Sequence, residues 1–343
     1  MHSDFFLGAN SGKGFYSLYD GFSRKNGDFL YLLKGGPGCG KSSFMRRIAD
    51  ESEKRGHTVT RILCSGDPES LDGIYIKELR AGFMDATAPH AAEPGIFALD
   101  SCYLDLGMFC KATRSELLRE YTAGYRSMYS CAYSYLAAAS ELANANIPGA
   151  VNDDAIRSVR SRAAASIRHG LSGHGSGTVT KRFISCISCM GHICLDETVN
   201  SLCERVYLLE DRFGLAAFYL DALCAAALDR GADVILCPSP LRPDIPEAVL
   251  IPSAGVAYIS ESSGYSAAPY RRIRLDTYAL RGSEQMSDLK HRSKLYGELC
   301  DTAVSYLSRA KELHDRLEAE YRPYIDFASL DEYCSELIQK LFI

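Results

Sequence analysis

The chain has 343 residues, of which 47% are hydrophobic, 24% charged and 10% aromatic, so it is not disordered and can bury a sizeable core. At about 150 residues per domain, this length predicts about two domains. Its 38 Lys and Arg against 43 Asp and Glu give a net charge of −5, which argues against a protein that mainly coats nucleic acid or an anionic membrane.

The apolar segments and the cysteines indicate where in the cell the protein would reside. The longest apolar stretch, 215–228, is interrupted by Asp221, and the N-terminal residues lack the pattern of a signal peptide. We therefore expect no membrane contact and a cytoplasmic protein. The 13 cysteines are scattered along the chain, which favours reduced thiols over a disulfide framework.

Taken in chain order, the sequence repeats itself. Four short matches recur in the same order at a spacing of about 171 to 176 positions, which indicates an internal duplication. They are 31–33 with 207–209, 55–56 with 230–231, 63–64 with 236–237, and 135–142 with 306–313. The Gly- and Ser-rich segment 170–177 has the composition of a flexible linker, so we predict domains over 1–172 and 178–343.

Each half has the pattern of an α/β unit with a parallel sheet and flanking helices, followed by a helical hairpin. The first half predicts strands over 29–33, 58–64 and 81–84 and helices over 42–54 and 115–145. The second half predicts strands over 206–209, 233–237 and 255–259 and helices over 216–229 and 288–321. The hairpins offer faces for a protein partner, although core packing is the default for such helices.

The first half contains a full match to the phosphate-binding pattern G-x-x-x-x-G-K-[ST], preceded by a predicted strand and followed by a predicted helix. The residues of this phosphate loop are Gly35, Gly36, Pro37, Gly38, Cys39, Gly40, Lys41 and Ser42, and Ser43 follows them. Glycines leave the backbone open, so the N–H groups from Gly38 to Ser43 would surround a β-phosphate at the positive end of the helix. Lys41 would reach the β- and γ-phosphates, and the Ser42 hydroxyl would bind Mg²⁺.

A nucleotide site needs a second magnesium anchor, usually an Asp at the end of a strand beside the loop. Asp85, at the end of the predicted strand 81–84, is the best candidate and would act together with Lys41 in catalysis. Asp67 is its main rival, followed by Asp72, and each would otherwise be an ordinary turn aspartate.

The residue that would position an attacking water is not evident. Many ATPases have a Glu directly after the strand Asp, whereas this chain has Ala86. Thr87 and His90 would line the γ-phosphate side, so slow or partner-dependent hydrolysis is expected. No stabilising arginine is assigned; the candidates are Arg46, Arg47, Arg80, Arg271, Arg272 and Arg274.

The second half has lost the phosphate loop. Aligning the two Arg-Gly pairs places Ala216 opposite Lys41 and Ala217 opposite Ser42. Glu210 and Asp211 also place two carboxylates where a polyphosphate would lie. We infer one working site per chain, and we expect the halves to form an internal pseudo-dimer in which the inactive copy covers or regulates the active one.

Two smaller constellations of residues could bind a metal ion or a nucleotide. The segment 186–194 contains Cys186, Cys189, His192 and Cys194, which are zinc-type ligands, but no second C-x-x-C follows, so structural cysteines are the better interpretation. The segment 8–15 imitates a phosphate loop but is one residue short. Its Lys13 would either reach a nucleotide or, as the simpler interpretation, stand in a solvated turn.

Taken together, the segments 6–19, 35–42, 64–73 and 85–90 resemble an uncharacterised family of bacterial ATP-binding proteins with two tandem P-loop halves. The resemblance implies a P-loop NTPase fold, ATP and Mg²⁺, and no cellular process. Family members often carry a phosphate loop in both halves; this chain departs from that pattern over 210–217.

The sequence therefore predicts a P-loop ATPase or ATP-dependent switch with one Mg-ATP site in the first half. ATP is preferred to GTP by the resemblance, since no guanine-reading N-K-x-D motif is present. The alternatives are a small-molecule kinase, in which Asp67 or Asp85 accepts a proton from the acceptor hydroxyl, and a scaffold that senses nucleotide without hydrolysing it.

Overall fold

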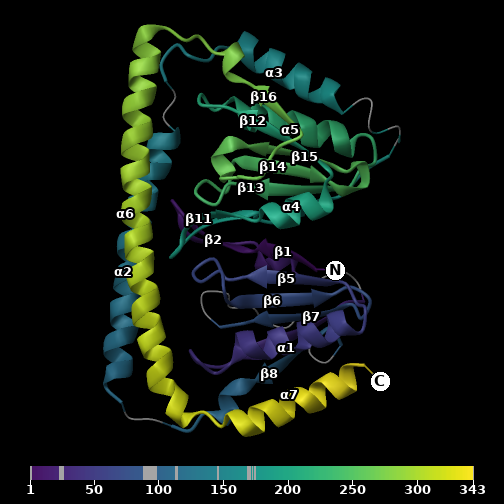
Figure 1. The fold of residues 1–343 in the computed structure, drawn as a ribbon, viewed down its shortest axis with the longest axis vertical. Coiled ribbons are helices and arrows are strands. Elements are labelled where there is room, and N and C mark those ends of the chain that lie inside the picture. The colour runs from purple at the N-terminus through teal and green to yellow at the C-terminus, as the bar shows by residue number, and fades with distance from the viewer. Residues whose placement is uncertain are drawn as a thin grey trace.

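The computed structural model describes residues 2–22, 27–87, 99–112, 115–144, 147–167, 171, 173 and 175–342. The protein is an α/β structure with two sheet-and-helix halves stacked on each other, and a pair of long helices runs along one side of both (Figure 1). All 13 cysteines are free thiols. Among the described helices, none combines the length and the apolar character needed to cross a membrane.

The first half is built on a six-stranded sheet in the order β1-β5-β6-β7-β4-β8. β6 runs antiparallel to both of its neighbours, and the other adjacent strands are parallel. The strands are β1 His2–Phe6, β4 Phe29–Lys34, β5 Val59–Leu63, β6 Leu71–Ile76, β7 Ala81–Asp85 and β8 Ser101–Asp105, and a separate hairpin joins β2 Gly8–Ser11 to β3 Gly14–Ser17.

The second half has a six-stranded sheet whose order, β9-β13-β14-β15-β12-β16, matches the first strand for strand. Its one antiparallel strand, β14, occupies the same place as β6. The strands are β9 Val179–Lys181, β12 Arg205–Glu210, β13 Val234–Pro238, β14 Pro246–Ile251, β15 Val256–Ser260 and β16 Arg271–Arg274, and the hairpin pairs β10 Ser185–Ser188 with β11 Gly191–Cys194. A short helix, α4 Asp196–Leu202, precedes β12.

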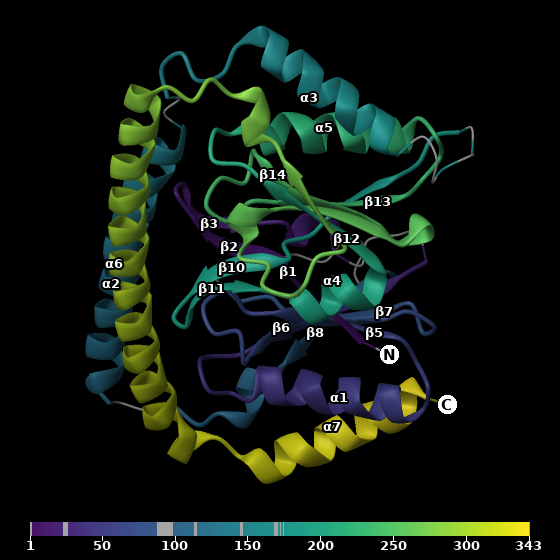
Figure 2. The same cartoon turned by 45° about the horizontal axis from the view of Figure 1, so that its top comes forward.

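The outer face of each sheet is covered by one helix from its own half and one from the other half. α1 Lys41–Lys54 covers the first sheet, and α7 Phe327–Leu341 lies against α1, where Leu330 and Cys334 join the same apolar core as Phe44 and Ile48. On the second sheet, α5 Leu215–Leu228 is covered by α3 Asp153–Ser166 (Figure 2). The halves have therefore exchanged their last helices.

The predicted hairpin after each half is wrong for this reason. α2 Leu117–Asn144 does not fold back on its own half; it packs along α6 Ser283–Tyr321, and the two form a pair that spans both halves (Figure 1). Tyr135 stacks on Tyr306 across this pair at 5.6 Å between ring centroids. An amphipathic helix predicts a buried face but does not say which element will cover it.

The two sheets face each other through a shared apolar core. Side chains of the first sheet, such as Leu32 and Ile62, belong to one cluster with Leu208 and Ile259 of the second. At the centre, Phe6 and Phe183 exchange both backbone hydrogen bonds at 2.9 Å, each N–H donating to the other's carbonyl. Burial of one continuous core on both sides gives the halves a fixed mutual position.

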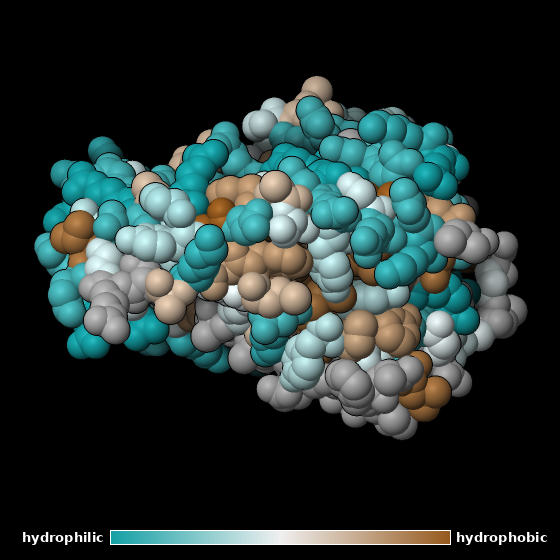
Figure 3. Space-filling model, turned by 90° about the horizontal axis from the view of Figure 1, so that it is seen from below, coloured by the Kyte–Doolittle hydropathy of each residue, from teal (hydrophilic) through white to brown (hydrophobic). Residues whose placement is uncertain are grey.

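Seen from below, the surface is hydrophilic around much of its rim and has apolar side chains across its middle (Figure 3). α7 leaves Phe327 exposed, and the short 3₁₀ helix Leu106–Phe109 that contacts α7 leaves Met108 exposed. Scattered exposed apolar side chains of this kind are normal on a folded protein.

All six predicted strands and all four predicted helices are present, with ends shifted by a few residues. The sheets are mixed rather than purely parallel, because β6 and β14 each insert an antiparallel strand. The predicted flexible linker over 170–177 is also revised in its described part. Gly173 and Gly177 lie so close to the backbone of residues 230–232 that a Cβ would approach a carbonyl oxygen to 2.5 Å and 2.0 Å.

Candidate nucleotide site

The phosphate loop connects the end of β4 to the start of α1, the position that the sequence predicts. Gly40 is the N-cap of α1 and has a left-handed backbone with φ of 79°, and Gly38 has φ of 72°. Residues with a side chain rarely adopt this backbone conformation, so glycine is favoured at both turns. Helix α1 then begins at Lys41, with its unpaired N–H groups directed at the loop.

Lys41 folds back over its own loop. Its ammonium donates to the carbonyls of Gly35 at 2.8 Å and Gly36 at 3.0 Å, and it lies 3.6 Å from the carboxylate of Asp85. The side chains of Lys41 and Asp85 are only 12% and 15% exposed. Lys41 and Asp85, which the sequence predicts to act together, are therefore close to each other. Because both side chains are largely shielded from solvent, salt screens the attraction between their charges less than it would at the surface.

Asp85 reaches this position because β7 lies parallel and adjacent to β4, with Asp85 opposite Leu33 in register. Parallel neighbours end at the same edge of a sheet, so the last residue of β7 stands beside the loop. Asp85 also accepts hydrogen bonds from the N–H of Thr87 at 2.9 Å and its hydroxyl at 2.5 Å. Thr87 thus orients the carboxylate, and His90 lies outside the described residues.

The remaining loop residues have structural partners. The Ser42 hydroxyl accepts from the N–H of Leu71 at 2.9 Å, whereas Ser43 is exposed. The Cys39 side chain is buried, and this burial raises the pKa of its thiol, so it serves packing rather than nucleophilic chemistry. Pro37 is half-buried between the exposed Gly36 and the turn at Gly38.

The rival aspartates are held away from this pair. Asp67 accepts from the Ser70 hydroxyl at 3.1 Å and lies 3.5 Å from the ammonium of Lys311 on α6. Asp72 is buried and accepts from the Tyr19 hydroxyl at 2.9 Å. Neither contact brings its carboxylate to Lys41, so the geometry favours Asp85 as the partner of the loop.

Five of the six candidate arginines have other partners. Arg46 donates to the Glu69 carbonyl, Arg47 pairs with Asp331 of α7, and Arg80 pairs with Asp28; in the second half Arg272 and Arg274 both pair with Glu210. No arginine among the described residues is assigned to the loop by these contacts.

The loop is covered by the far end of the chain, which the sequence did not reveal. Glu318, near the end of α6, accepts a hydrogen bond from the Gly38 N–H at 3.2 Å. A Cβ on Gly40 would lie 3.1 Å from Leu330 of α7. Lys311, His314, Asp315 and Glu318 do recur at helical spacing, but such a polar stripe normally marks a solvated face.

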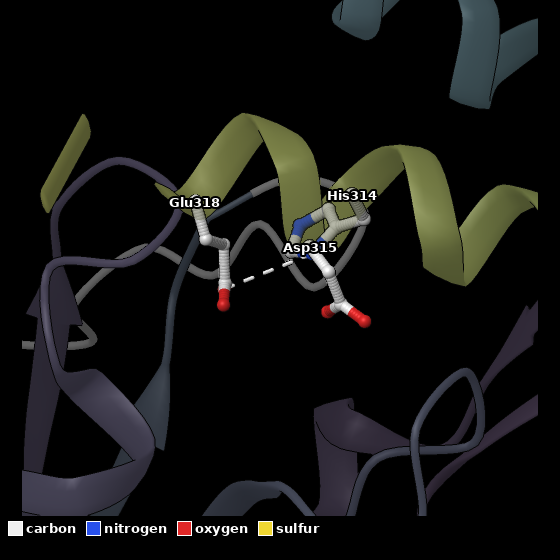
Figure 4. Close-up of side chains that lie close together, drawn as sticks. All are labelled: His314, Asp315 and Glu318. Carbon is white, nitrogen blue, oxygen red and sulfur yellow. Dashed lines mark ion pairs between the residues drawn. The ribbon is translucent and has the colours of Figure 1, made fainter. Parts of the chain in front are cut away.

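Three of these α6 side chains lie close together. His314, Asp315 and Glu318 offer ligand atoms within 4.8 Å of one another, and the His314 ring nitrogen is 3.7 Å from the Glu318 carboxylate (Figure 4). All three come from one exposed helix face, and Asp315 is also bound by Lys311 at 2.6 Å. This grouping is an ordinary charged surface next to the phosphate loop.

At the equivalent place in the second half, the loop is shorter and an aspartate of the loop itself accepts from its amides. The loop between β12 and α5 spans only residues 211–214, two fewer than in the first half, and Gly214 with φ of 82° is the N-cap. The Asp211 carboxylate accepts from the N–H of Phe213 at 3.1 Å and of Ala216 at 2.7 Å. Burial raises the pKa of Asp211, while these N–H donors lower it.

The structure corrects the sequence alignment of this loop by one residue. Since Gly214 caps α5 as Gly40 caps α1, Leu215 stands opposite Lys41 and Ala216 opposite Ser42. The register of β15 with β12 also places Ser260 at the position that Asp85 has on β7. The second half therefore lacks the lysine, the hydroxyl and the strand carboxylate of the first.

The two smaller constellations are hairpin turns. Cys186, Cys189, His192 and Cys194 lie on β10, its turn and β11, and they do not converge into a ligand group. Burial raises the pKa of the Cys186 and Cys194 thiols, as expected for structural cysteines. Lys13 stands in the exposed turn between β2 and β3, where it pairs with Asp244 rather than pointing at the loop.

The chain was compared with protein-family models, curated proteins and solved structures, and none of them matches it.

Proposed function

We propose that the protein binds Mg-ATP at the phosphate loop of its first half and acts as an ATPase or an ATP-dependent switch. The observation that supports this most directly is the pairing of Lys41 with Asp85. A lysine at the first turn of a helix, after a glycine-rich loop, lies 3.6 Å from an aspartate at the end of the adjacent parallel strand. This combination suits a polyphosphate and its magnesium ion.

The roles follow from the chemistry of the groups. Loop N–H groups and the positive end of α1 attract phosphate oxygens, and Lys41 exchanges the loop carbonyls for the β- and γ-phosphates. Ser42 and Asp85 are the residues that would hold Mg²⁺; both supply oxygen ligands, which this ion prefers. The metal, when bound, neutralises charge on the transferred phosphoryl group.

We further propose that the two halves arose by duplication and that the second serves as a packing and regulatory partner. The identical strand order supports this, as does an aromatic pair kept in both halves: Tyr31 stacks on Phe83 at 4.5 Å, and Tyr207 stacks on Tyr258 at 4.6 Å. The reciprocal pairing of Phe6 with Phe183 fits an internal pseudo-dimer. This history agrees with the family resemblance, from which the preference for ATP is also proposed. A cytoplasmic setting is proposed from the pattern of apolar segments and cysteines.

The test is nucleotide affinity of the Lys41→Ala variant, measured by calorimetry with a non-hydrolysable ATP analogue and Mg²⁺. We expect the affinity to fall by about a hundredfold or more, since the ammonium is the main point charge on the phosphates. Lys54→Ala, at the exposed end of the same helix, is the matched control and should bind like the parent. Equal binding by Lys41→Ala and the parent would remove the proposal.

Turnover then separates the three forms of this function. Phosphate release without an acceptor supports the ATPase, and label transfer from ATP to a metabolite hydroxyl supports the kinase. Tight binding with negligible turnover supports the sensing scaffold. Among the described residues, the Asp85 carboxylate has the Thr87 hydroxyl beside it and no second carboxylate in contact, so we expect slow basal hydrolysis.

A further inference from the structure

Glu318 occupies a donor that a bound phosphate would need. The Gly38 N–H, in the middle of the phosphate loop, donates to Glu318 Oε1 at 3.2 Å. Because a carboxylate and a phosphate both present anionic oxygens to such donors, the two groups compete for the same amide. The loop in this structure is thus partly satisfied by the chain's own anion.

The contact involves the helix itself as well as the side chain. A Cβ on Gly38 would lie 3.2 Å from the Cβ and carbonyl oxygen of Glu318 and 3.3 Å from its Cα. The backbone of the loop and the backbone of α6 are therefore in direct contact. A ligand that enlarges or reshapes this loop has to displace the last turns of α6.

The Glu318 carboxylate is exchangeable. Its side chain is 44% exposed, and it comes from a residue 280 positions further along the chain. When it leaves the amide, water can solvate both partners at little cost. Asp211 of the second half, by contrast, accepts from amides two and five residues away and remains in place with its own loop.

The contact between Glu318 and Gly38 lies near the end of the long helix α6. α6 has 39 residues, which corresponds to about 58 Å of helix, and it packs along α2 beside both halves. One turn before Glu318, His314 faces Tyr125, and two turns before it, Lys311 faces Asp67 of the first half. Two backbone hydrogen bonds hold the bend between α6 and α7. The Lys111 N–H donates to the Tyr324 carbonyl at 2.8 Å, and the Asp326 N–H donates to the Phe109 carbonyl at 2.9 Å.

We propose that Glu318 is an internal competitor of the nucleotide, and that ATP binding expels it from Gly38 and shifts the C-terminal turns of α6. This inference rests on the proposed function and adds its regulation: the site reports occupancy to the α2–α6 pair through one carboxylate. Relaxation of the contact lets ATP in, and departure of the nucleotide lets Glu318 return.

The test uses Glu318→Gln, which keeps the shape and removes the charge, and Glu318→Ala, which removes the carboxylate entirely. Both should bind the non-hydrolysable ATP analogue with Mg²⁺ about tenfold more tightly than the parent. Glu312→Gln, an exposed glutamate on the same helix, is the matched control and should leave affinity unchanged. Hydrogen exchange over residues 311–326 should rise when the parent binds the analogue, and should already be high in Glu318→Ala without it.

Four results would overturn the inference. Unchanged affinity in both Glu318 variants, with Lys41-dependent binding intact, shows that the carboxylate does not compete, and the proposed function survives. Lost turnover with unchanged affinity shows instead that Glu318 acts on the attacking water. Loss of the Mg²⁺ dependence of binding shows that it holds the metal. If neither the parent nor any Glu318 variant binds the analogue, the proposed function fails together with the inference.

Discussion

Helices α1 and α5 begin in the same way, but the amides at their starts are satisfied differently. Each follows a glycine in the left-handed conformation, Gly40 or Gly214, and each has a carboxylate on the amides in front of it. In the second half that carboxylate, Asp211, belongs to the loop itself and is half-buried. In the first half it is Glu318, which is half-exposed and belongs to a distant helix.

This difference shows two ways in which the amides at the start of a helix find an acceptor, one permanent and the other open to exchange. A helix start needs an acceptor for its amides, and a nearby side chain supplies one permanently. Shortening the loop by two residues and placing Asp211 within it gives the second helix an anion of its own. The first half keeps the longer loop and the lysine, and its amides stay available for exchange.

The largest expected effect separates the strand ends of the two halves. Asp85→Asn should lower Mg-dependent turnover by about 10³-fold, because the neutral amide is a poor ligand for the magnesium ion. Ser260→Asn, at the equivalent position of β15, should leave turnover unchanged. Steady-state phosphate release at several Mg²⁺ concentrations measures both, and equal losses in the two variants would contradict a single working site.

Each half also carries a buried acid on its antiparallel strand, Asp72 on β6 and Glu247 on β14, and the second one should make stability depend on pH. Burial raises the pKa of Glu247 from 4.5 to about 7, although Ser185, Ser239 and Arg242 oppose the shift, and the Cys194 and Cys237 thiols lie nearby. The folded state therefore holds a proton that the unfolded state releases between these values. Unfolding free energy should fall by about 3 kcal/mol as pH rises from 4.5 to above 7.

Urea unfolding at a series of pH values measures this slope. Glu247→Gln should flatten it, because the amide does not titrate. Glu204→Gln, an exposed glutamate in the same half, should retain it. A slope in Glu247→Gln as steep as in the parent would assign the pH dependence to other groups.

The two loop carboxylates should differ in what they contribute to stability. Asp211→Ala leaves the N–H of the buried Ala216 without its acceptor, so we expect a loss of about 2 kcal/mol in unfolding free energy. Glu318→Ala exposes the Gly38 amide to water and should change it by less than about 0.5 kcal/mol. Asp211→Asn retains an acceptor oxygen and should fall between them; equal costs for the two alanine variants would refute the contrast.

The smallest expected effect compares the two capping glycines. Gly214→Ala places a Cβ in open space and should cost about 1 kcal/mol from the left-handed backbone alone. Gly40→Ala meets the same strain and also presses on Leu330 at 3.1 Å, so it should cost roughly 1 kcal/mol more. Urea unfolding of the two variants measures the difference, and identical losses would show that α7 yields freely at this contact.

The sequence was sufficient wherever the signal was local. The phosphate loop is a contiguous motif, and Asp85 could be assigned because neighbouring parallel strands end at the same edge of a sheet. Two of the strands that escaped prediction lack a clear apolar pattern: β6 begins Leu71, Asp72, Gly73, and β1 includes Ser3 and Asp4. Their place comes from pairing with neighbours, which no local pattern records.

The sequence was insufficient where distant segments meet. The repeat predicted two similar halves, but two folded units can keep or exchange their final helices without changing a single amphipathic pattern. Glu318 lies in a densely charged helix, where a solvated side chain is the simplest expectation. Only its contact with Gly38 distinguishes it from neighbours such as Glu312, and that contact joins residues 280 positions apart.

The exchange of α3 and α7 affects how the molecule is made. The outer core of the first half needs Leu330 and Cys334, which follow the entire second sheet in the chain. During synthesis, the first sheet and α1 must wait, with one apolar side uncovered, until α7 has emerged. Premature termination anywhere in the second half would therefore leave the first half without the helix that completes its outer core.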